Sequence, residues 1–150
     1  MKKFLLGLFL ILGVMSFAAP KFVDMTKVKN AGYVIKNERE DILTMTTSDD
    51  DSAIIISFST ANISSKEISD LLKSNALRNS ENFIATLDNN RAYINEFEAQ
   101  GFYSYMIVPK KEKVKNQHTY ATYVSSKKLS KNDLSKITNA ILDEAESYIK

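Results

Sequence analysis

Several short segments of this chain alternate apolar and polar residues, and this alternation constrains the fold more than any other feature of the sequence. In residues 53–60, Ile54, Ile56 and Phe58 fall on one side of an extended chain. Side chains of a β-strand point alternately to opposite faces, so a period of two predicts a strand. Alternation, or a short apolar run between polar turns, predicts strands at residues 32–36, 41–47, 53–60, 82–87, 91–99, 102–108 and 119–125. The short turns between them exclude parallel crossovers, so we expect an antiparallel sheet.

Two helices are predicted beside the sheet. Ser64 and Glu67 have the spacing of a capping box, which opens a short helix. Its predicted packing face carries Ile68, Leu71, Leu72 and Asn75, with Ala76 beside them. Ser130 opens a longer C-terminal helix whose apolar face holds Leu134, Ile137, Ile141, Ala145 and Tyr148. The sequence therefore predicts an α+β fold: an antiparallel β-sheet flanked by a short middle helix and a long C-terminal helix that packs on it.

The first 18 residues have the features of a signal peptide. Two lysines precede a mostly apolar stretch from Phe4 to Phe17, and Ser16 and Ala18 are small residues suited to cleavage after Ala18. We therefore predict a signal peptide at residues 1–18, a single α+β domain at 19–150, and export to the periplasm or the extracellular space. An uncleaved anchor is the alternative, but the apolar stretch is shorter than the roughly 18–20 residues that span a bilayer.

The net charge and the absence of cysteine exclude several classes of function. Loss of Lys2 and Lys3 with the signal peptide lowers the 20 Lys and Arg residues to 18, which equals the 18 Asp and Glu residues. A neutral chain argues against nucleic-acid binding, which calls for a basic domain. The sequence contains no cysteine, so the fold depends on its core alone, and thiolate metal sites and cysteine nucleophiles are excluded. No phosphate-binding loop or nucleotide fingerprint is present, and we predict no cofactor.

The order of strands and helices resembles the PsbP-like fold, an antiparallel sheet between helices that small exported bacterial proteins also use. The local similarity lies in residues 41–43, in residues 51–58, and in the turn and aromatic strand of residues 86–93. Gly32-Tyr33 stands where such domains often have Gly-Trp. Because this family is functionally diverse, the resemblance implies an accessory or binding module and no particular reaction.

Residues that usually carry chemistry are few. His118 is the single histidine, and we expect it to be exposed where a loop enters the last strand. The turn at residues 49–51 holds three aspartates, but it lacks the alternating ligand pattern of a calcium loop. Glu96 and Glu98 share a strand face, as an acid and base for glycoside hydrolysis would, although outward-facing carboxylates explain them equally simply. We therefore predict no catalytic residue and no metal site.

Two groups of side chains are candidates for binding. Lys110, Lys111, Lys113 and Lys115 crowd one loop and, together with Lys127, Lys128 and Lys131 across the last strand, would form a basic patch for an acidic partner or an envelope polymer. The second group consists of tyrosines on adjacent predicted strands: Tyr103, Tyr105, Tyr120 and Tyr123, with Tyr93 nearby. Exposed tyrosines stack on sugars and peptides. Ordinary solvation of the lysines and burial of the tyrosines under the terminal helix are the alternative interpretations.

The sequence favours an exported, non-enzymatic binding domain of the bacterial envelope. Its partner would be a protein or an envelope component, reached through the tyrosines or the lysines of residues 110–115. Two alternatives stay open: a carboxylate-based hydrolase or metal-dependent enzyme, and a self-associating structural or adhesive subunit. The sequence leaves the oligomeric state undetermined, and after cleavage no transmembrane anchor is expected.

Overall fold

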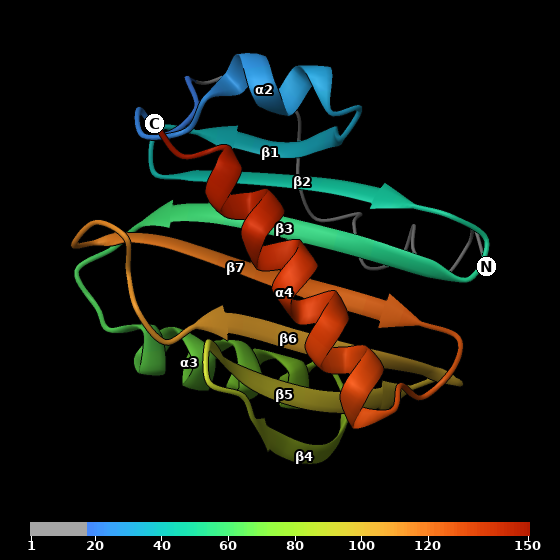
Figure 1. Cartoon of the computed structure of the whole chain (residues 1–150). Coiled ribbons are helices and arrows are strands. Elements are labelled where there is room, and N and C mark those ends of the chain that lie inside the picture. The colour runs from blue at the N-terminus through green and yellow to red at the C-terminus, as the bar shows by residue number, and fades with distance from the viewer. Residues whose placement is uncertain (1–17) are drawn as a thin grey trace.

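The computed structural model describes residues 18–150, and they form one seven-stranded antiparallel sheet with helices on both faces (Figure 1). The signal-peptide prediction falls on residues 1–17, which lie outside the described part, and on Ala18, which is exposed. The strands are β1 (Val34–Arg39), β2 (Ile42–Ser48), β3 (Ser52–Thr60), β4 (Asn82–Asp88), β5 (Ala92–Ala99), β6 (Phe102–Pro109) and β7 (Gln117–Ser125). The helices are α2 (Met25–Asn30), α3 (Ser65–Arg78) and α4 (Lys131–Ser147). The predicted α+β class, with an antiparallel sheet, a short middle helix and a long C-terminal helix, is confirmed.

The sheet consists of two meanders joined at its centre. β1, β2 and β3 follow one another at one side, and β4 to β7 fill the other, in the order β1-β2-β3-β7-β6-β5-β4. β3 and β7 pair along their whole length, from Ser52 with Ser125 to Thr60 with Gln117. α3 is the covalent connection between the two meanders, so the central ladder unites segments that are distant in sequence.

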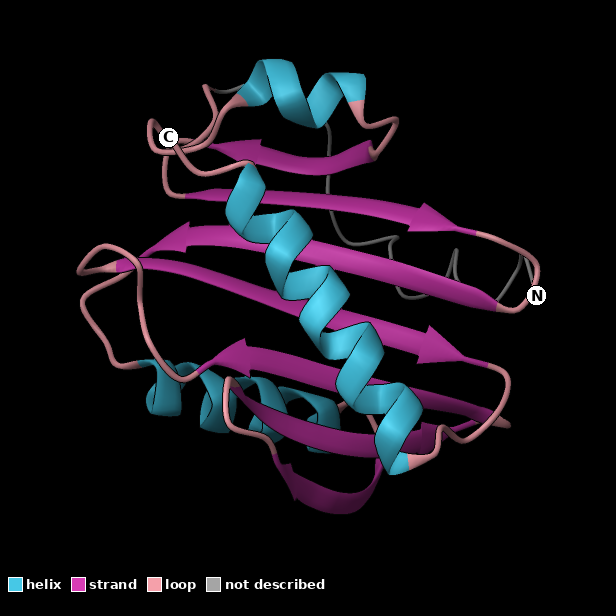
Figure 2. Cartoon of the chain, viewed as in Figure 1, coloured by secondary structure: helices cyan, strands magenta, loops and turns pink. Residues whose placement is uncertain are grey.

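α4 crosses one face of the sheet diagonally (Figure 2). Its buried residues Leu134, Ile141, Leu142 and Ala145 join a core cluster with sheet residues that include Ile56 and Ile107. Burying one such aliphatic side chain contributes about 1.5–3 kcal/mol to folding. This face, the α4 face, therefore holds the main core of a domain that has no disulfide.

α3 lies on the opposite face, over β5 and β6. Both hydrogen bonds of the predicted capping box are present at its N-terminus. The buried stripe of α3 is Ser65, Ile68, Ser69 and Ala76, whereas Leu71 of the predicted face is 54% exposed. The small side chains let the helix approach the sheet closely, and the buried Asn95 amide donates to the Ser69 hydroxyl at 3.0 Å. Side-chain size and a polar contact thus override the apolar periodicity here.

The start of the described chain differs from the sequence-based expectation in two ways. Residues 25–30 form the short helix α2, capped by the Asp24 carboxylate, which accepts from the Thr26 and Lys27 amides. β1 begins at Val34, after Gly32, because the positive φ of Gly32 (79°) turns the chain after the helix. Within residues 18–150, no helix combines the length and the apolar character needed to cross a membrane.

β4 is the outer strand next to β5, and it is irregular. Its register with β5 shifts between Phe83 and Ala85, so Ile84 is an extra residue in the ladder. The Lys73 ammonium of α3 lies 3.5 Å from the centre of the Phe83 ring. A bulge and a lysine thus occupy the free edge of the sheet on this side.

Candidate binding site at the β6–β7 loop

The connection between β6 and β7, residues 110–116, is called the lysine loop below. It projects from one end of the sheet (Figure 1). Lys111, Lys113 and Lys115 are exposed, and Val114 between them is 46% exposed. Val114 forms a bridge with Gln117, and Asn116 has a positive φ of 65°. The loop is therefore a defined turn with its lysines directed to solvent.

A buried histidine anchors the lysine loop. His118 is only 2% exposed, so the expectation of an exposed histidine is wrong: β7 begins at Gln117, two residues earlier than predicted, and the ring points into the side of the sheet that carries α3. Its Nε2 lies 3.0 Å from the Ala61 carbonyl oxygen, and its Nδ1 lies 3.5 Å from Glu112 Oε1. Glu112 Oε2 accepts from the Asn116 amide at 3.1 Å. The Ala61 amide in turn donates to the Asn116 carbonyl at 3.1 Å, which closes the network.

Ser65, His118 and Glu112 line one hollow, but they do not form a catalytic triad. A histidine base needs a free ring nitrogen that faces the nucleophile, while the acid holds the other nitrogen. Here Glu112 faces Nδ1 and the Ala61 carbonyl faces Nε2, so neither nitrogen is directed at the Ser65 hydroxyl. The arrangement holds the loop in place and does not activate the serine.

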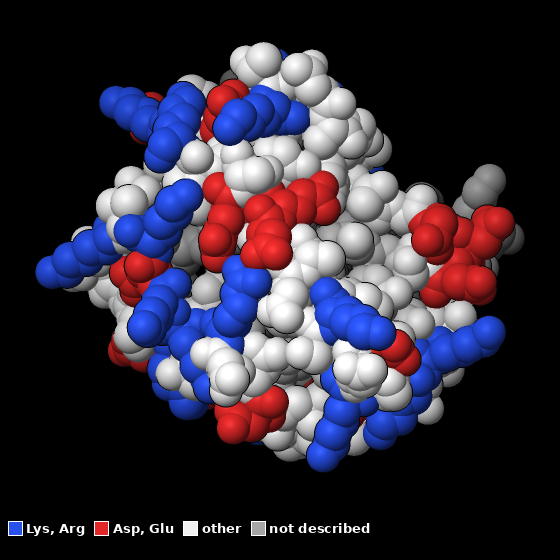
Figure 3. Space-filling model, in the orientation of Figure 1, with Lys and Arg blue, Asp and Glu red and all other residues white. Residues whose placement is uncertain are grey.

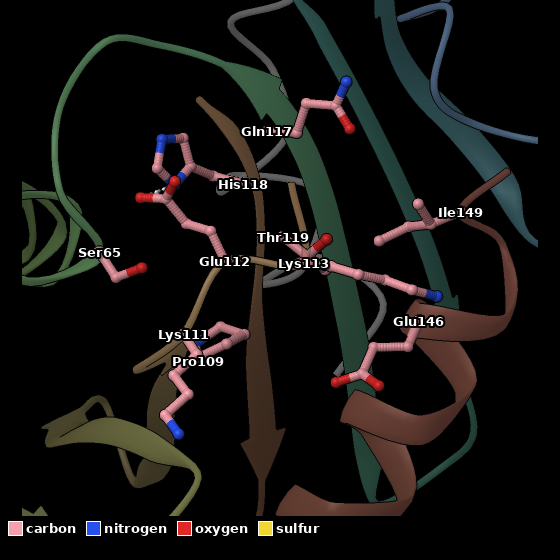
Figure 4. A pocket seen from close by; sticks show the side chains of 10 residues that line it. All are labelled: Ser65, Pro109, Lys111, Glu112, Lys113, Gln117, His118, Thr119, Glu146 and Ile149. Atoms are coloured by element: carbon pink, nitrogen blue, oxygen red, sulfur yellow. Dashed lines mark ion pairs between the residues drawn. The ribbon is translucent and has the colours of Figure 1, made fainter. Parts of the chain in front are cut away.

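The hollow lies where the sheet splits (Figure 4). The ladder between β6 and β7 stops at Ile107 with Ala121, and the two strands diverge beyond this pair. The resulting space is partly open to solvent and small, with a volume of about 30 Å³. It is lined by Ser65, Pro109, Lys111, Glu112, Lys113, Gln117, His118, Thr119, Glu146 and Ile149.

Lys110 differs from the other lysines of the loop. Its ammonium pairs with Asp88 at 3.1 Å and lies 5.6 Å from the centre of the Tyr93 ring. Lys110 is thus tied to the neighbouring connection between β4 and β5. The lysines of this loop that can contact a partner are therefore the three exposed ones, Lys111, Lys113 and Lys115.

The single basic patch expected from Lys110 to Lys115 with Lys127, Lys128 and Lys131 does not form. The two groups lie at opposite ends of β7, which at nine residues separates them by roughly 26 Å. Lys128 instead pairs with Glu96 at 3.4 Å. Figure 3 shows basic side chains along the edge of the molecule that carries the lysine loop and a separate basic group near the opposite end.

The candidate tyrosines are divided between the two faces of the sheet. Tyr105 pairs with Tyr123 in register, so both point to the α4 face, and Tyr103 shares that face two residues along β6. Tyr105 is fully buried, and its hydroxyl accepts from the Leu129 amide at 2.8 Å. Tyr103 and Tyr123 are partly buried and pack against the core cluster. These three side chains support α4.

Tyr120 lies on the opposite face, paired with Ser57. Burial raises the pKa of its hydroxyl, and hydrogen bonds with Ser57 and Ser59 partly oppose that shift. Tyr120 is only partly buried. It is thus the one of the four tyrosines that stands apart from the α4 face.

Glu96 and Glu98 share the α4 face, as their spacing predicts, but only Glu98 is near solvent. Glu98 accepts from the Gly101 amide at 3.1 Å and from Asn82 Nδ2 at 3.3 Å, so it stabilises the β5–β6 turn. Glu96 is 3% exposed, which corrects the expectation of an outward carboxylate. Glu96 also affects its neighbour Tyr105. Burial is the largest cause that raises the pKa of the Tyr105 hydroxyl, and the hydrogen bond with the Leu129 amide lowers this pKa. The charge of Glu96 and its hydrogen bond with Tyr105 raise the pKa further. Glu98 is thus a turn carboxylate, whereas Glu96 pairs with Lys128 at 3.4 Å and its buried Oε1 accepts no hydrogen bond within residues 18–150.

The Asp49 carboxylate bonds within the turn at Asp49 to Ser52, and the Asp51 carbonyl of the turn also accepts from the Ser126 amide at 3.0 Å. Asp49 Oδ1 accepts from the Asp51 amide at 2.9 Å, the Ser52 amide at 2.6 Å and the Ser52 hydroxyl at 3.1 Å. The hydrogen bond from the Asp51 amide is the largest cause that lowers the pKa of Asp49. Among residues 18–150, no group of three histidine, aspartate or glutamate side chains is arranged to hold a metal ion.

Sequence reasoning identified the lysines of the loop but not the residues that position them. Glu112 is one acid among four lysines, and nothing in the sequence distinguishes its inward direction. Ser65, Gln117 and Thr119 are ordinary polar residues whose convergence depends on the split between β6 and β7. Comparison with protein-family models, curated proteins and solved structures gives no match to this chain.

Proposed function

We propose that the chain is an exported, non-enzymatic binding module of the bacterial envelope that contacts a partner protein or an envelope component through the lysine loop. The observation that carries this proposal is a loop fixed from within by Glu112 and His118, with Lys111, Lys113 and Lys115 directed outward. Export rests on the signal-peptide features of residues 1–18. The resemblance to PsbP-like domains supports the same class of function.

Two properties of the lysine loop favour binding: its fixed conformation and its charge. A partner that meets an ordered loop avoids most of the entropy cost of ordering it, so more of the contact energy is available as affinity. Three lysines within five residues also create a local positive field on an otherwise neutral chain, which speeds association with an anionic partner. Lys110 contributes less, because Asp88 neutralises it.

The tyrosines have a smaller part in this proposal. Tyr103, Tyr105 and Tyr123 lie beneath α4, and only Tyr120 stands on the other face. A partner that stacks on tyrosines would therefore meet one ring and not a row. We place Tyr120 outside the primary contact surface.

The test is a pull-down from envelope extract with the chain from Ala19 onward. A Lys111→Glu, Lys113→Glu, Lys115→Glu variant is compared with a matched charge reversal far from the loop, Lys127→Glu, Lys131→Glu, Lys136→Glu. We expect a partner that the wild type and the distant variant retain and the loop variant loses. If all three proteins retain the partner equally, the loop does not bind it, and Tyr120 becomes the next candidate contact.

Size-exclusion chromatography of the same three proteins addresses the self-association alternative. A wild-type oligomer that the loop variant dissolves would identify a second copy of the chain as the partner. If no partner is retained and no oligomer forms, the binding proposal fails. A survey of glycoside and ester substrates would then test the carboxylate-based hydrolase.

A further inference from the structure

We propose that the folded domain protects its own predicted signal-peptide cleavage site, so that proteolytic removal of residues 1–18 must precede final folding. This inference rests on the proposed function, because it takes cleavage after Ala18 as the step that releases an exported domain. It adds the order of two events: the precursor is cut first, and residues 19–24 dock on the core afterwards. It is carried by the burial of the residues that directly follow the predicted cleavage site.

Burial begins immediately after the predicted scissile bond, which joins Ala18 to Ala19. Ala18 is exposed, but Ala19 is partly buried and packs against the core cluster, and Pro20 is buried. Phe22 is 9% exposed and Val23 is 1% exposed, and both belong to the core cluster. The chain therefore enters the main core within a few residues of the bond that a signal peptidase must cut.

Backbone contacts join residues 20–24 to residues 148–150, and this pair of segments is called the clasp below. Two hydrogen bonds connect its sides, from the Asp24 amide to the Tyr148 carbonyl at 2.7 Å and from the Lys150 amide to the Phe22 carbonyl at 2.9 Å. Val23 and Ile149 also form an antiparallel bridge. Figure 1 shows the C-terminus beside the blue segment that leads into α2. The residues after the cleavage site are thus held by the C-terminal end of the domain.

Side chains strengthen the clasp from both of its sides. The Phe22 ring meets the Phe58 ring of β3 edge to face, with 6.4 Å between the ring centres. The Lys27 ammonium of α2 donates to the Ser147 carbonyl at 3.0 Å, where α4 ends. The Asp24 carboxylate caps α2 and so fixes the direction in which the chain leaves the clasp. Opening the clasp therefore breaks contacts with the sheet and with both of these helices.

A closed clasp opposes cleavage because proteases cut segments that are accessible and free of the core. A bond next to packed residues is cut only when that segment opens, and the cleavage rate then follows the population of the open form. Residues 148–150 follow every strand in sequence, so the clasp closes only after the strands have been made, which leaves time for cleavage. A chain that is cut first then closes, whereas a chain that closes first keeps residues 1–18.

The test measures cleavage by a bacterial signal peptidase in detergent micelles. The substrates are the folded full chain and a peptide of residues 1–30, which contains the same bond without the C-terminal side of the clasp. Mass spectrometry gives the position and the rate of cleavage. We expect cleavage of the peptide after Ala18, and cleavage of the folded chain that is slower by about tenfold or more.

Two variants of the full chain weaken the clasp, and a third is the matched control. Phe22→Ala removes the aromatic contact with β3, and truncation after Tyr148 removes most of the C-terminal side. Phe83→Ala removes a similar edge-to-face contact, with Phe97, at the other edge of the sheet. We expect faster cleavage of both clasp variants than of wild type and an unchanged rate in the control. Thermal unfolding confirms that each variant is folded, and the peptide with Phe22→Ala corrects for a direct effect on the protease.

The outcomes separate this inference from the proposed function. Equal cleavage rates for the folded chain and the peptide would overturn the inference and leave the proposed function intact. Equal acceleration by Phe83→Ala and Phe22→Ala would also overturn it, because global stability and not the clasp would then protect the bond. A peptide that is not cut after Ala18 would overturn both the inference and the proposed export.

Discussion

The lysine loop and the aspartate turn at residues 49–52 are both charged connections between antiparallel strands, yet they are stabilised in opposite ways. Glu112 of the loop reaches inward to a histidine buried in the sheet. Asp49 of the turn bends back onto the amides of Asp51 and Ser52. The inward carboxylate of one connection reaches the core of the domain, whereas the Asp49 carboxylate of the other bonds only within its own turn, which contacts the end of β7 through Asp51 and Ser126.

The difference shows that some charged side chains of a connection stabilise the fold, while others stay available to contact a partner. A turn whose side chain satisfies its own backbone has few unused hydrogen-bonding groups, and a change there stays local. A loop held by one inward carboxylate leaves its other side chains unengaged, and a change at the anchor reaches the sheet. Three mutational tests sharpen this contrast, in order of decreasing expected effect.

The largest effect is expected from His118→Ala. The change leaves the Ala61 carbonyl and the Glu112 carboxylate without their partner and opens a cavity beside the sheet, so we expect a loss of about 2–4 kcal/mol in the free energy of unfolding. Urea denaturation measures the loss, and hydrogen exchange at the Asn116 amide reports release of the loop. Asp50→Ala in the aspartate turn is the matched control, with a change below about 0.5 kcal/mol. Equal losses in the two variants would remove the distinction between the connections.

A second test uses a polar cluster that, like the loop, joins separate elements. Tyr33 and Tyr148 contact edge to face, and the Tyr148 hydroxyl donates to Glu144 at 2.7 Å. Burial, with Glu144 as the next cause, raises the pKa of both hydroxyls above its ordinary value. The unfolded chain therefore ionises first, so this stability is complete below about pH 10 and is lost as pH rises further.

We expect Glu144→Gln to make this alkaline decline shallower, because a neutral amide no longer opposes the phenolates. Urea denaturation of wild type and variant between about pH 8 and 11 measures it, and Tyr33→Phe with Tyr148→Phe is the control that removes both hydroxyls. A decline of unchanged slope in Glu144→Gln would show that burial alone governs the cluster.

The smallest effect is expected at the aspartate turn. Because the pKa of Asp49 is lowered, its contribution is complete above the ordinary aspartate value of about 3.9 and disappears as pH falls through the lowered value. Asp49→Asn keeps an acceptor oxygen, so we expect little change near neutral pH and a weaker dependence of stability on acid. Denaturation at acidic and neutral pH compares the variant with wild type. A large loss at neutral pH would contradict a carboxylate that acts only within its own turn.

The strands and their faces were predictable because alternation is a local property. The positions of Ile54, Ile56 and Phe58 define one face before any partner strand is known, and the structure places Ile56 and Phe58 in the core cluster. α2 was missed because six residues carry too little periodicity and Asp24 is its main capping signal.

The candidate site was predictable only in part, because it depends on pairing between distant strands. The burial of His118 follows from where β7 starts, and the distance between the two groups of lysines follows from the length of β7. The burial of Glu96 follows from its place under the first part of α4 and beside Tyr105. No spacing in the sequence reports that β6 and β7 separate after Ile107.

The central pairing of β3 with β7 also has a consequence for how the chain folds. Thr60 and Gln117 are partners in the ladder although a helix and three strands lie between them in sequence, and pairs this remote close slowly. Until residues 117–125 are available, the first meander exposes the edge of β3, with its run of three isoleucines, as a template for other chains. Truncation before β7 therefore converts the centre of the sheet into an aggregation-prone boundary.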